Sequence, residues 1–473
     1  MLFTLLAACL TSADDYAALQ AQLEDLDGDG IVGRDDCDDS SADVYPGATE
    51  IPDDGLDNDC DPTTPDESPP ISAWTGVVSA STLTHVDGVG TYYAFGQSVA
   101  VADLDDDGVA EAIVGSPRDQ TTGTGAGALY VFPGPGEDDR GVFGNPTPLY
   151  GDVTGAVLVA GVGARISSLL TEEAAYILMG AESDGATGVA LAIQYPPHDV
   201  DALTASTMTI SGPAGFPTAI TGWQASQALV VVSDAWSADS AVYAVPPNQS
   251  ALSFSQLGTP VLESGGATDA LGAALATGDL DGDGQDELLV GAPGADADAG
   301  RVYIARDLGG DYGYDVWLGS NGAGNSLSTG DFNGDGYIDF ATRSDTATYL
   351  VLGPAHGGDL ADADVVLASD VYAICLATDL DGDGKSDLAV GLPGEDNGGE
   401  VRVFYDLSAG SLALEDASLV IEARLQRDLF GESLAGGADL DGDGDDDLLV
   451  GASEALGANA RNGAAYLIPG GGS

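Results

Sequence analysis

The chain has 473 residues, 44% of them hydrophobic and 68 of them glycine, so it can bury a substantial core. Its formal net charge of −66, from 12 Lys+Arg against 78 Asp+Glu, would repel nucleic acid and anionic membrane surfaces. We therefore expect no nucleic-acid partner, and divalent cations are the natural counterions. The many glycines and the lack of long helix-period apolar stripes favour an all-β chain with little helix.

The N-terminus, MLFTLLAACLTSADD, contains an apolar run that ends in Leu6-Ala7-Ala8-Cys9. This run resembles a bacterial lipoprotein lipobox, which is cleaved before a cysteine that then carries lipid. Residues 1–8 would be the signal peptide and Cys9 the lipidated residue, with an ordinary signal peptide as the alternative. The first eight residues lack the basic start and longer apolar core of a usual signal, which a start codon further upstream would explain. No other segment is long and apolar enough to span a bilayer.

Residues 25–61 are dense in aspartate and have few apolar side chains to pack. Their first part follows the ligand order of an EF-hand loop, with acids at positions 1, 3, 5 and 12, glycine at 6 and a backbone carbonyl at 7. The residues in that order are Asp25, Asp27, Asp29, Asp36, Gly30 and Ile31. Cys37 and Cys60 can close the module with a disulfide, as suits an exported chain. An unstructured acidic stalk is the alternative interpretation.

The same stretch resembles the MopE-type metal-binding motif. Its DCDD, YPGA.E and DG.DNDCD signatures are present at 36–39, 45–50 and 54–61. The resemblance implies a small calcium-type module, with one or more ions, between a membrane anchor and a larger domain. Residues 62–73, which include PTTPDESPP, are then expected to form an extended linker.

From residue 74 to 473 the chain repeats one acidic pattern five times. DLDDDGVAE begins at residue 103, DLDGDGQDE at 279, DFNGDGYID at 331, DLDGDGKSD at 379 and DLDGDGDDD at 439. An oxygen cage for a hard cation needs converging carboxylates and a sharp turn, and each copy supplies both. Paired catalytic carboxylates would need one differentiated site, whereas five near-identical copies indicate a repeated structural role.

We therefore predict up to five calcium ions here, each bound by the residues at positions 1, 3, 5, 7 and 9 of a loop. The predicted ligands are Asp103, Asp105, Asp107, Val109 and Glu111; Asp279, Asp281, Asp283, Gln285 and Glu287; Asp331, Asn333, Asp335, Tyr337 and Asp339; Asp379, Asp381, Asp383, Lys385 and Asp387; and Asp439, Asp441, Asp443, Asp445 and Asp447. The loop with Asn333 has one carboxylate fewer, so we expect it to bind more weakly.

These units resemble FG-GAP repeats, the units of the β-propeller in integrin α subunits. Phe95-Gly96 and Phe430-Gly431 supply the FG, and Gly291-Ala292-Pro293 supplies the GAP, whereas the fifth unit has Ala341-Thr342-Arg343 at that place. The resemblance implies a propeller with its metal loops on one face. It also implies that partner contacts come mainly from loops on the opposite face.

The sequence between Asp103 and Asp279 has room for two more units. Residues 164–195 and 217–245 each contain three apolar strand candidates joined by turn residues, so we predict seven blades. The last unit lacks a fourth strand, while residues 75–86 form an unpaired strand candidate before the first. We expect residues 75–86 to pair beside 464–468 and close the ring.

Other notable side chains indicate packing rather than chemistry. Cys375 occupies a place held by apolar residues in other units, so we expect it to be buried. Three histidines match no metal or nucleophile spacing: His85, His198 and His356. A core position is favoured over a recognition face for Trp223, Trp236, Tyr195 and Tyr243. No nucleophile elbow, phosphate loop or His-Glu-x-x-His motif is present, so we expect no enzyme.

These features predict an exported, lipid-anchored, calcium-binding β-propeller that acts as a monomeric binding or adhesion module at a bacterial surface. Its ligand would be a protein or a glycan. One alternative is a carbohydrate-binding propeller with shallow sites between blades. Another is an accessory domain of a hydrolytic system.

Overall fold

The computed structural model describes the greater part of residues 76–471. The described residues are 76–88, 94–121, 127–134, 146–150, 166–170, 174–183, 187–195, 206–213, 216–224, 227–235, 240–247, 249, 251–264, 266, 268–307, 312–394, 397–405, 410–456 and 461–471. The predicted lipid anchor at Cys9, the module at 25–61 with Cys37 and Cys60, and the linker at 62–73 lie outside these ranges, as do His198 and Trp236.

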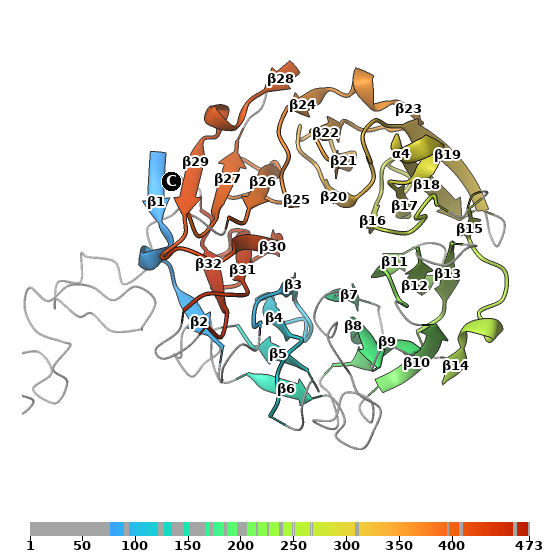
Figure 1. The fold of residues 1–473 in the computed structure, drawn as a ribbon, viewed down its shortest axis with the longest axis horizontal. Helices are drawn as coiled ribbons and strands as arrows, with labels where there is room; N and C mark the ends of the chain where they lie inside the picture. Colours follow the sequence, from blue (N-terminus) through green and yellow to red (C-terminus); the bar gives the residue numbers. More distant parts are fainter. Residues whose placement is uncertain are drawn as a thin grey trace, which may run out of the picture. The chain divides into compact units, whose positions relative to one another are not determined.

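The chain divides into two compact units, and the described residues all belong to the second, Pro69–Pro135 with Val142–Ser473. Within that unit, seven sheets are arranged around a ring as the blades of a β-propeller (Figure 1). The fold is therefore the predicted seven-bladed, nearly all-β architecture. No helix among the described residues has both the length and the apolar character needed to cross a membrane.

Each blade runs from an inner strand to an outer edge, and its first three strands form an antiparallel meander. In blades 1 to 3 the strands, from the inside outward, are β3 (Ser98–Ala102), β4 (Glu111–Ser116), β5 (Ala128–Phe132) and β6 (Thr147–Tyr150); β7 (Ile166–Leu170), β8 (Ala175–Ser183), β9 (Thr187–Gln194), β10 (Ser206–Pro213) and β14 (Leu252–Ser253); and β11 (Ile220–Gln224), β12 (Ala228–Asp234), β13 (Ala241–Val245) and β15 (Leu262–Glu263). Blades 2 and 3 are the two units that the sequence predicted without metal loops.

The remaining four blades follow the same plan. Their strands are β16 (Leu275–Gly278), β17 (Glu287–Ala292), β18 (Arg301–Asp307), β19 (Tyr312–Leu318) and β23 (Gly358–Asp359) in blade 4; β20 (Ser326–Gly330), β21 (Asp339–Arg343), β22 (Thr348–Val351), β24 (Val365–Leu367) and β28 (Gly410–Leu412) in blade 5; β25 (Ala373–Thr378), β26 (Asp387–Leu392), β27 (Glu400–Phe404), β29 (Leu419–Glu422) and β1 (Gly76–Ser79) in blade 6; and β30 (Phe430–Ala438), β31 (Asp447–Ala452), β32 (Ala464–Ile468) and β2 (His85–Asp87) in blade 7. Among the described residues, the α-helical segment is α4 (Ala295–Asp298), after β17.

The core lies between neighbouring blades. Seven clusters of buried apolar residues each combine two adjacent blades, so each blade is packed on both faces. For this reason the second strands are continuous apolar runs rather than alternating ones, and β17 and β31 are buried at every position. Trp223 and Cys375 are buried as predicted, and Tyr195 and Tyr243 are half-buried against these clusters.

The inner strands are crowded, which explains their small residues. A Cβ on Gly330 of β20 would lie 1.9 Å from the carbonyl oxygen of Leu376 in β25. Similarly, a Cβ on Gly278 of β16 would lie 2.7 Å from the side chain of Ile338, beside the next blade. Small side chains therefore allow the blades to approach one another near the axis of the ring.

Four outer segments each join two blades. Each segment pairs in parallel with the outer strand of one blade, makes a single 3₁₀ turn and then becomes the outer strand of the next blade. They are β14-η3-β15, β23-η4-β24, β28-η5-β29 and β1-η2-β2, where the 3₁₀ turns are η3 (Phe254–Gln256), η4 (Leu360–Asp362), η5 (Leu414–Asp416) and η2 (Ala80–Thr82). Because each segment holds two sheets, it protects their edges and ties neighbouring blades together.

The N-terminal segment closes the ring, although in two places rather than one. His85–Asp87 pairs with β32, with His85 opposite Tyr466, as predicted. The prediction is wrong for Gly76–Ser79, which pairs in parallel with β29 of blade 6. The 3₁₀ turn at Ala80–Thr82 divides the expected single strand into two.

Candidate metal centres

The five acidic loops join the first strand to the second in blades 1, 4, 5, 6 and 7, and all five fold alike. The position-1 carboxylate anchors the turn by accepting backbone N–H bonds from inside its own loop. In the loop at 279–287, Asp279 Oδ1 accepts from Gly282 at 2.7 Å and Asp283 at 3.1 Å, and Asp279 Oδ2 accepts from Gly284 at 2.9 Å. This local network makes the loop a preformed turn.

Two further side chains complete each loop. The position-5 carboxylate accepts the position-7 amide at 2.9 Å in all five copies. The position-9 acid, the first residue of the second strand, accepts the position-2 amide at 2.6 to 2.9 Å. The position-9 acid thus connects the metal loop to the buried second strand.

Backbone geometry explains a second glycine that the sequence pattern had left without a role. Positions 4 and 6 both have positive φ, for example 76° at Gly282 and 89° at Gly284. The first loop has Asp106 at position 4 with φ of 64°, a conformation that aspartate tolerates better than most residues. The two residues with positive φ let the chain turn sharply within the loop.

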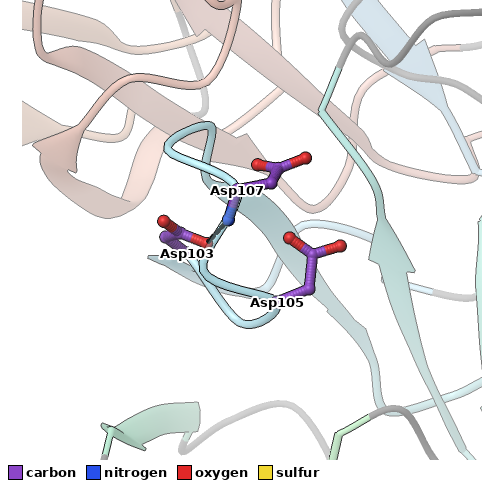
Figure 2. Close-up of side chains that lie close together, drawn as sticks. All are labelled: Asp103, Asp105 and Asp107. Carbon is purple, nitrogen blue, oxygen red and sulfur yellow. Dashed lines mark hydrogen bonds between the residues drawn. The ribbon is translucent and has the colours of Figure 1, made fainter.

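The carboxylates gather as a metal site requires. In four loops, three carboxylates each have an oxygen within 4.8 Å of the other two: Asp103, Asp105 and Asp107; Asp279, Asp281 and Glu287; Asp379, Asp381 and Asp387; and Asp439, Asp441 and Asp447. Figure 2 shows the first set, with the amide of Asp107 donating to Asp103 Oδ1 at 3.2 Å. Oxygen-only donors of this kind suit a hard divalent cation.

The fifth loop, at 331–339, differs as its sequence suggested. Asn333 Nδ2 donates to Asp335 Oδ2 at 3.0 Å, and Asn333 Oδ1 accepts the amide of Asp335 at 2.8 Å. The asparagine therefore contributes an uncharged oxygen. The other predicted contacts, including the carbonyls of Val109, Gln285, Tyr337, Lys385 and Asp445, remain predictions.

Burial raises the pKa of the position-9 acids. Burial, reinforced by the neighbouring carboxylates, raises the pKa of Asp387 and of Asp447 to about 8. The same causes raise the pKa of Glu111 and of Glu287 to about 7, and that of Asp339 to about 6. A cation that neutralises these carboxylates would remove this penalty, so the donor set fits a divalent ion.

One loop has a basic neighbour that the repeat pattern did not predict. Arg306, in β18, donates from Nε to Asp281 Oδ2 at 3.2 Å and lies 3.7 Å from Glu287 Oε1. The other oxygen of Asp281, Oδ1, is buried and has no hydrogen-bond partner. In blade 6 the matching position of the third strand holds Tyr405. Strand β17 separates Arg306 from the loop at 279–287 in the sequence. Only the tertiary structure therefore shows that the arginine contacts this loop.

Neighbouring loops are also connected to one another. The position-8 amide of one loop donates to the position-1 carbonyl of the loop before it, at 3.1 Å from Ile338 to Asp279 and at 2.8 Å from Ser386 to Asp331. The bond from Ala110 to Asp439, at 2.6 Å, joins blade 1 to blade 7. The five loops therefore lie on one rim of the ring.

Two family models match parts of the chain. The FG-GAP repeat model matches residues 95–132, 271–304, 371–404 and 430–468, in blades 1, 4, 6 and 7. The Cu-binding MopE metal-binding motif matches residues 36–66. The chain is a seven-bladed β-propeller that carries FG-GAP repeats and a MopE-type motif. Blade 5, with Asn333 and Arg343, lies outside the matched ranges.

The chain is similar to parts of larger proteins. It is 32% identical to integrin alpha-V of Gallus gallus over an alignment of 205 residues that covers 38% of this chain and 20% of the relative. It is 29% identical to integrin alpha-PS2 of Drosophila melanogaster over 38% of this chain and 15% of the relative. It is 30% identical to phosphatidylinositol-glycan-specific phospholipase D of Homo sapiens over 35% of this chain and 24% of the relative. The matches thus span less than a quarter of each relative.

Proposed function

We propose that this protein is a calcium-binding β-propeller that serves as an exported binding or adhesion module at a bacterial cell surface. The observation that carries the proposal is the repetition of one folded acidic loop in five blades on one rim of the ring. Five ions would brace that rim and make the propeller a rigid platform. Similarity to two integrin α chains supports a binding role.

Calcium is preferred over magnesium because of the ligands. Each loop offers up to four carboxylates plus a carbonyl, and Ca²⁺ accepts such crowded, irregular oxygen sets, whereas Mg²⁺ demands octahedral geometry and retains water. The N-terminal MopE-type motif would hold one or more further ions. Anchoring through Cys9 belongs to the same proposal.

The proposal is tested with the full-length chain and isolated bacterial envelopes. Binding should be saturable in calcium and lost after chelation, and Cys9→Ser should move the protein from the membrane fraction to the soluble fraction. Envelope binding that is independent of calcium would contradict the platform role, and unchanged fractionation of Cys9→Ser would contradict lipidation. The resemblance to a phospholipase D makes ester turnover a further readout, and turnover would revive the hydrolytic alternative.

Asn333→Asp should tighten one calcium site, because it restores the carboxylate that the sibling loops have at position 3. Isothermal titration calorimetry should show one site moving from a weaker to a tighter class. Asn321→Asp is the matched control, since Asn321 contacts Thr346 and Asp345 outside any metal loop. An unchanged titration of Asn333→Asp would show that charge at position 3 does not set affinity.

Arg306→Tyr should raise the calcium affinity of the loop at 279–287 by about tenfold, because a positive charge beside Asp281 and Glu287 opposes a divalent cation. The substitution copies the residue found in blade 6. Arg402→Gln is the control, since Arg402 lies on the third strand of blade 6 and bonds Glu400 and the carbonyl of Leu414. Weaker binding by Arg306→Tyr would mean that the arginine orders the site rather than competing for it.

Calcium stabilisation should depend on pH. The raised pKa values of the position-9 acids mean that their protonated forms stabilise the metal-free fold. This contribution is complete below their ordinary pKa near 4 and is lost as pH rises through about 6 to 8. The metal-free Tm should therefore fall over that window while the calcium-induced rise in Tm grows. Thermal melts from pH 5 to 8.5 test this, and Asp447→Asn should flatten the trend; a calcium effect equal at all pH values would contradict it.

A further inference from the structure

A cavity of about 520 Å³ lies on the axis of the ring. It is lined by residues at the beginning of the inner strands of six blades: β3, β11, β16, β20, β25 and β30. Figure 1 shows these strands facing the centre of the ring. The acidic loops follow the other ends of five of these strands, all but β11, so the cavity opens away from the rim that carries the loops.

At this end of the ring, the same contact recurs between neighbouring blades. A glycine of one blade lies against a backbone carbonyl of the next. A Cβ on Gly291 would lie 1.9 Å from Gly324 O, one on Gly391 would lie 2.0 Å from Gly431 O, and one on Gly451 would lie 1.9 Å from Gly96 O. At three junctions no side chain can replace the glycine without moving the blades apart.

The junction between blades 5 and 6 breaks this rule. Strand pairing places Arg343 where blades 1, 4, 6 and 7 have this glycine, because Arg343 is opposite Ser326 as Gly115 is opposite Ser98. The carbonyl that faces it belongs to Val371, and Arg343 Nη1 donates to it at 2.9 Å. Arg343 therefore meets this carbonyl with a hydrogen-bond donor where the other three junctions have a glycine, and it lines the cavity.

The mouth of the cavity is a ring with one residue from each of five blades. In each of these blades, one inner-strand residue pairs with the glycine or Arg343 at the blade junction, and the mouth residue is the one directly before it. The five mouth residues are Gln97, Ala273, Asn325, Tyr372 and Glu432. Tyr372 is 55% exposed, although large apolar surfaces are usually buried in such a crowded region. The fold fixes the backbone of this ring and leaves its side chains free to vary in chemistry.

The side chains divide the cavity into two arcs. Blades 5, 6, 7 and 1 contribute polar groups, with Asn325, Arg343, Tyr372, Glu432 and Gln97. Blades 3 and 4 contribute apolar side chains, three of them alanine: Ala219, Ile220, Ala273, Ala274 and Leu275. A second cavity of about 100 Å³ shares Gln97 and Glu432, so the polar arc extends toward Arg118.

We propose that this axial cavity binds a mono- or disaccharide, with Arg343 and Tyr372 as the residues that determine recognition. The inference rests on the proposed binding role and names its ligand class. The cavity volume lies in the range of small-molecule sites, which is about 300 to 1,000 Å³. An exposed tyrosine can pack against the C–H face of a sugar ring, and the apolar arc leaves room for the ring itself.

The hydrogen-bonding chemistry favours hydroxyl groups over a simple ion. Arg343 only donates, Glu432 as a carboxylate only accepts, and the amides of Asn325 and Gln97 do both. A carboxylate ligand would meet Glu432, and Asp370 already lies 3.7 Å from Arg343. A cationic ligand would meet Arg343. Sugar hydroxyls donate and accept, so they can satisfy the whole arc.

The test uses the full-length, calcium-loaded protein on an array of mono- and disaccharides, followed by calorimetry with the free sugars that bind. Neutral hexoses, N-acetylhexosamines and hexuronic acids form separate arms. Tyr372→Ala and Arg343→Gly should each weaken binding by at least about tenfold, the loss of one good contact or charged hydrogen bond. Tyr314→Ala, which removes another exposed tyrosine from the outer strand β19, should leave affinity unchanged.

Asn325→Ala gives a second polar variant should Arg343→Gly alter the blade junction, and calcium-dependent melting verifies folding of each. The absence of any saccharide ligand, or a ligand whose affinity Tyr372→Ala and Asn325→Ala leave unchanged, would overturn the inference. Envelope binding that persists in those variants would then show that the binding role stands while the axial site is not responsible for it.

Discussion

Removing calcium should lower the Tm of the propeller by about 10 °C or more. Each occupied site contributes about 2.7 kcal/mol when free calcium is a hundredfold above its Kd, and several sites act on one cooperative ring. Without the ion, three carboxylates in each of four loops have oxygens within 4.8 Å of one another, and burial raises the pKa of the position-9 acid in blades 4, 6 and 7. Calorimetric melts with excess calcium and after chelation would measure the difference.

Two controls make this result specific. Magnesium at the same concentration should restore much less stability, because its octahedral geometry fits these loops poorly. Asp441→Asn and Asp381→Asn should each weaken calcium binding at one site, and so reduce the calcium effect on Tm, without changing the turn, since the position-1 carboxylate anchors it. Melts that superimpose with calcium and with chelator would show that the loops are not metal sites.

Deleting residues 1–90 should prevent the propeller from forming a stable monomer, whereas deleting residues 1–70 should be tolerated. The longer deletion removes β1 and β2 together with Ala80 and Leu83, which are 0% and 5% exposed in the core between blades 6 and 7. It also exposes the edges of β29 and β32, which invites association between chains. Size-exclusion chromatography and thermal melts would measure both effects.

Local contacts show how the closure is held. His85 stacks on Tyr466 at 5.1 Å and accepts a hydrogen bond from Arg424 at 3.0 Å, and Asn462 donates to the carbonyl of Gly88 at 2.8 Å. Because Leu83 is buried in the same region, between blades 6 and 7, Leu83→Ala should lower the free energy of unfolding by about 2 to 5 kcal/mol.

Val77→Ala, at a position that is 63% exposed on β1, is the matched control and should cost little. If both truncated proteins were equally soluble, monomeric and calcium-responsive, the N-terminal segment would not be what closes the ring. A Leu83→Ala variant as stable as Val77→Ala would likewise show that the N-terminal segment does not close the ring.

The sequence by itself determined the features that repeat. Five copies of an acidic loop in one register identified the loops between the first and second strands, and the spacing between them gave the blade count, because each unit uses a similar length of chain for the same strands. The missing last strand also pointed correctly to His85–Asp87. Such patterns are readable because they depend on local turns and on strand periodicity.

Only the tertiary structure decided what depends on neighbouring blades. The pairing of Gly76–Ser79 with blade 6 follows from the 3₁₀ turn and the free edge of β29, and Arg306 reaches its metal loop only because β18 lies beside β17. Arg343 was visible in the sequence as a departure from the repeat, but its meaning comes from the carbonyl of Val371 in the next blade. These contacts join residues far apart in the chain, and no local pattern encodes which blade edges and side chains the closed ring brings together.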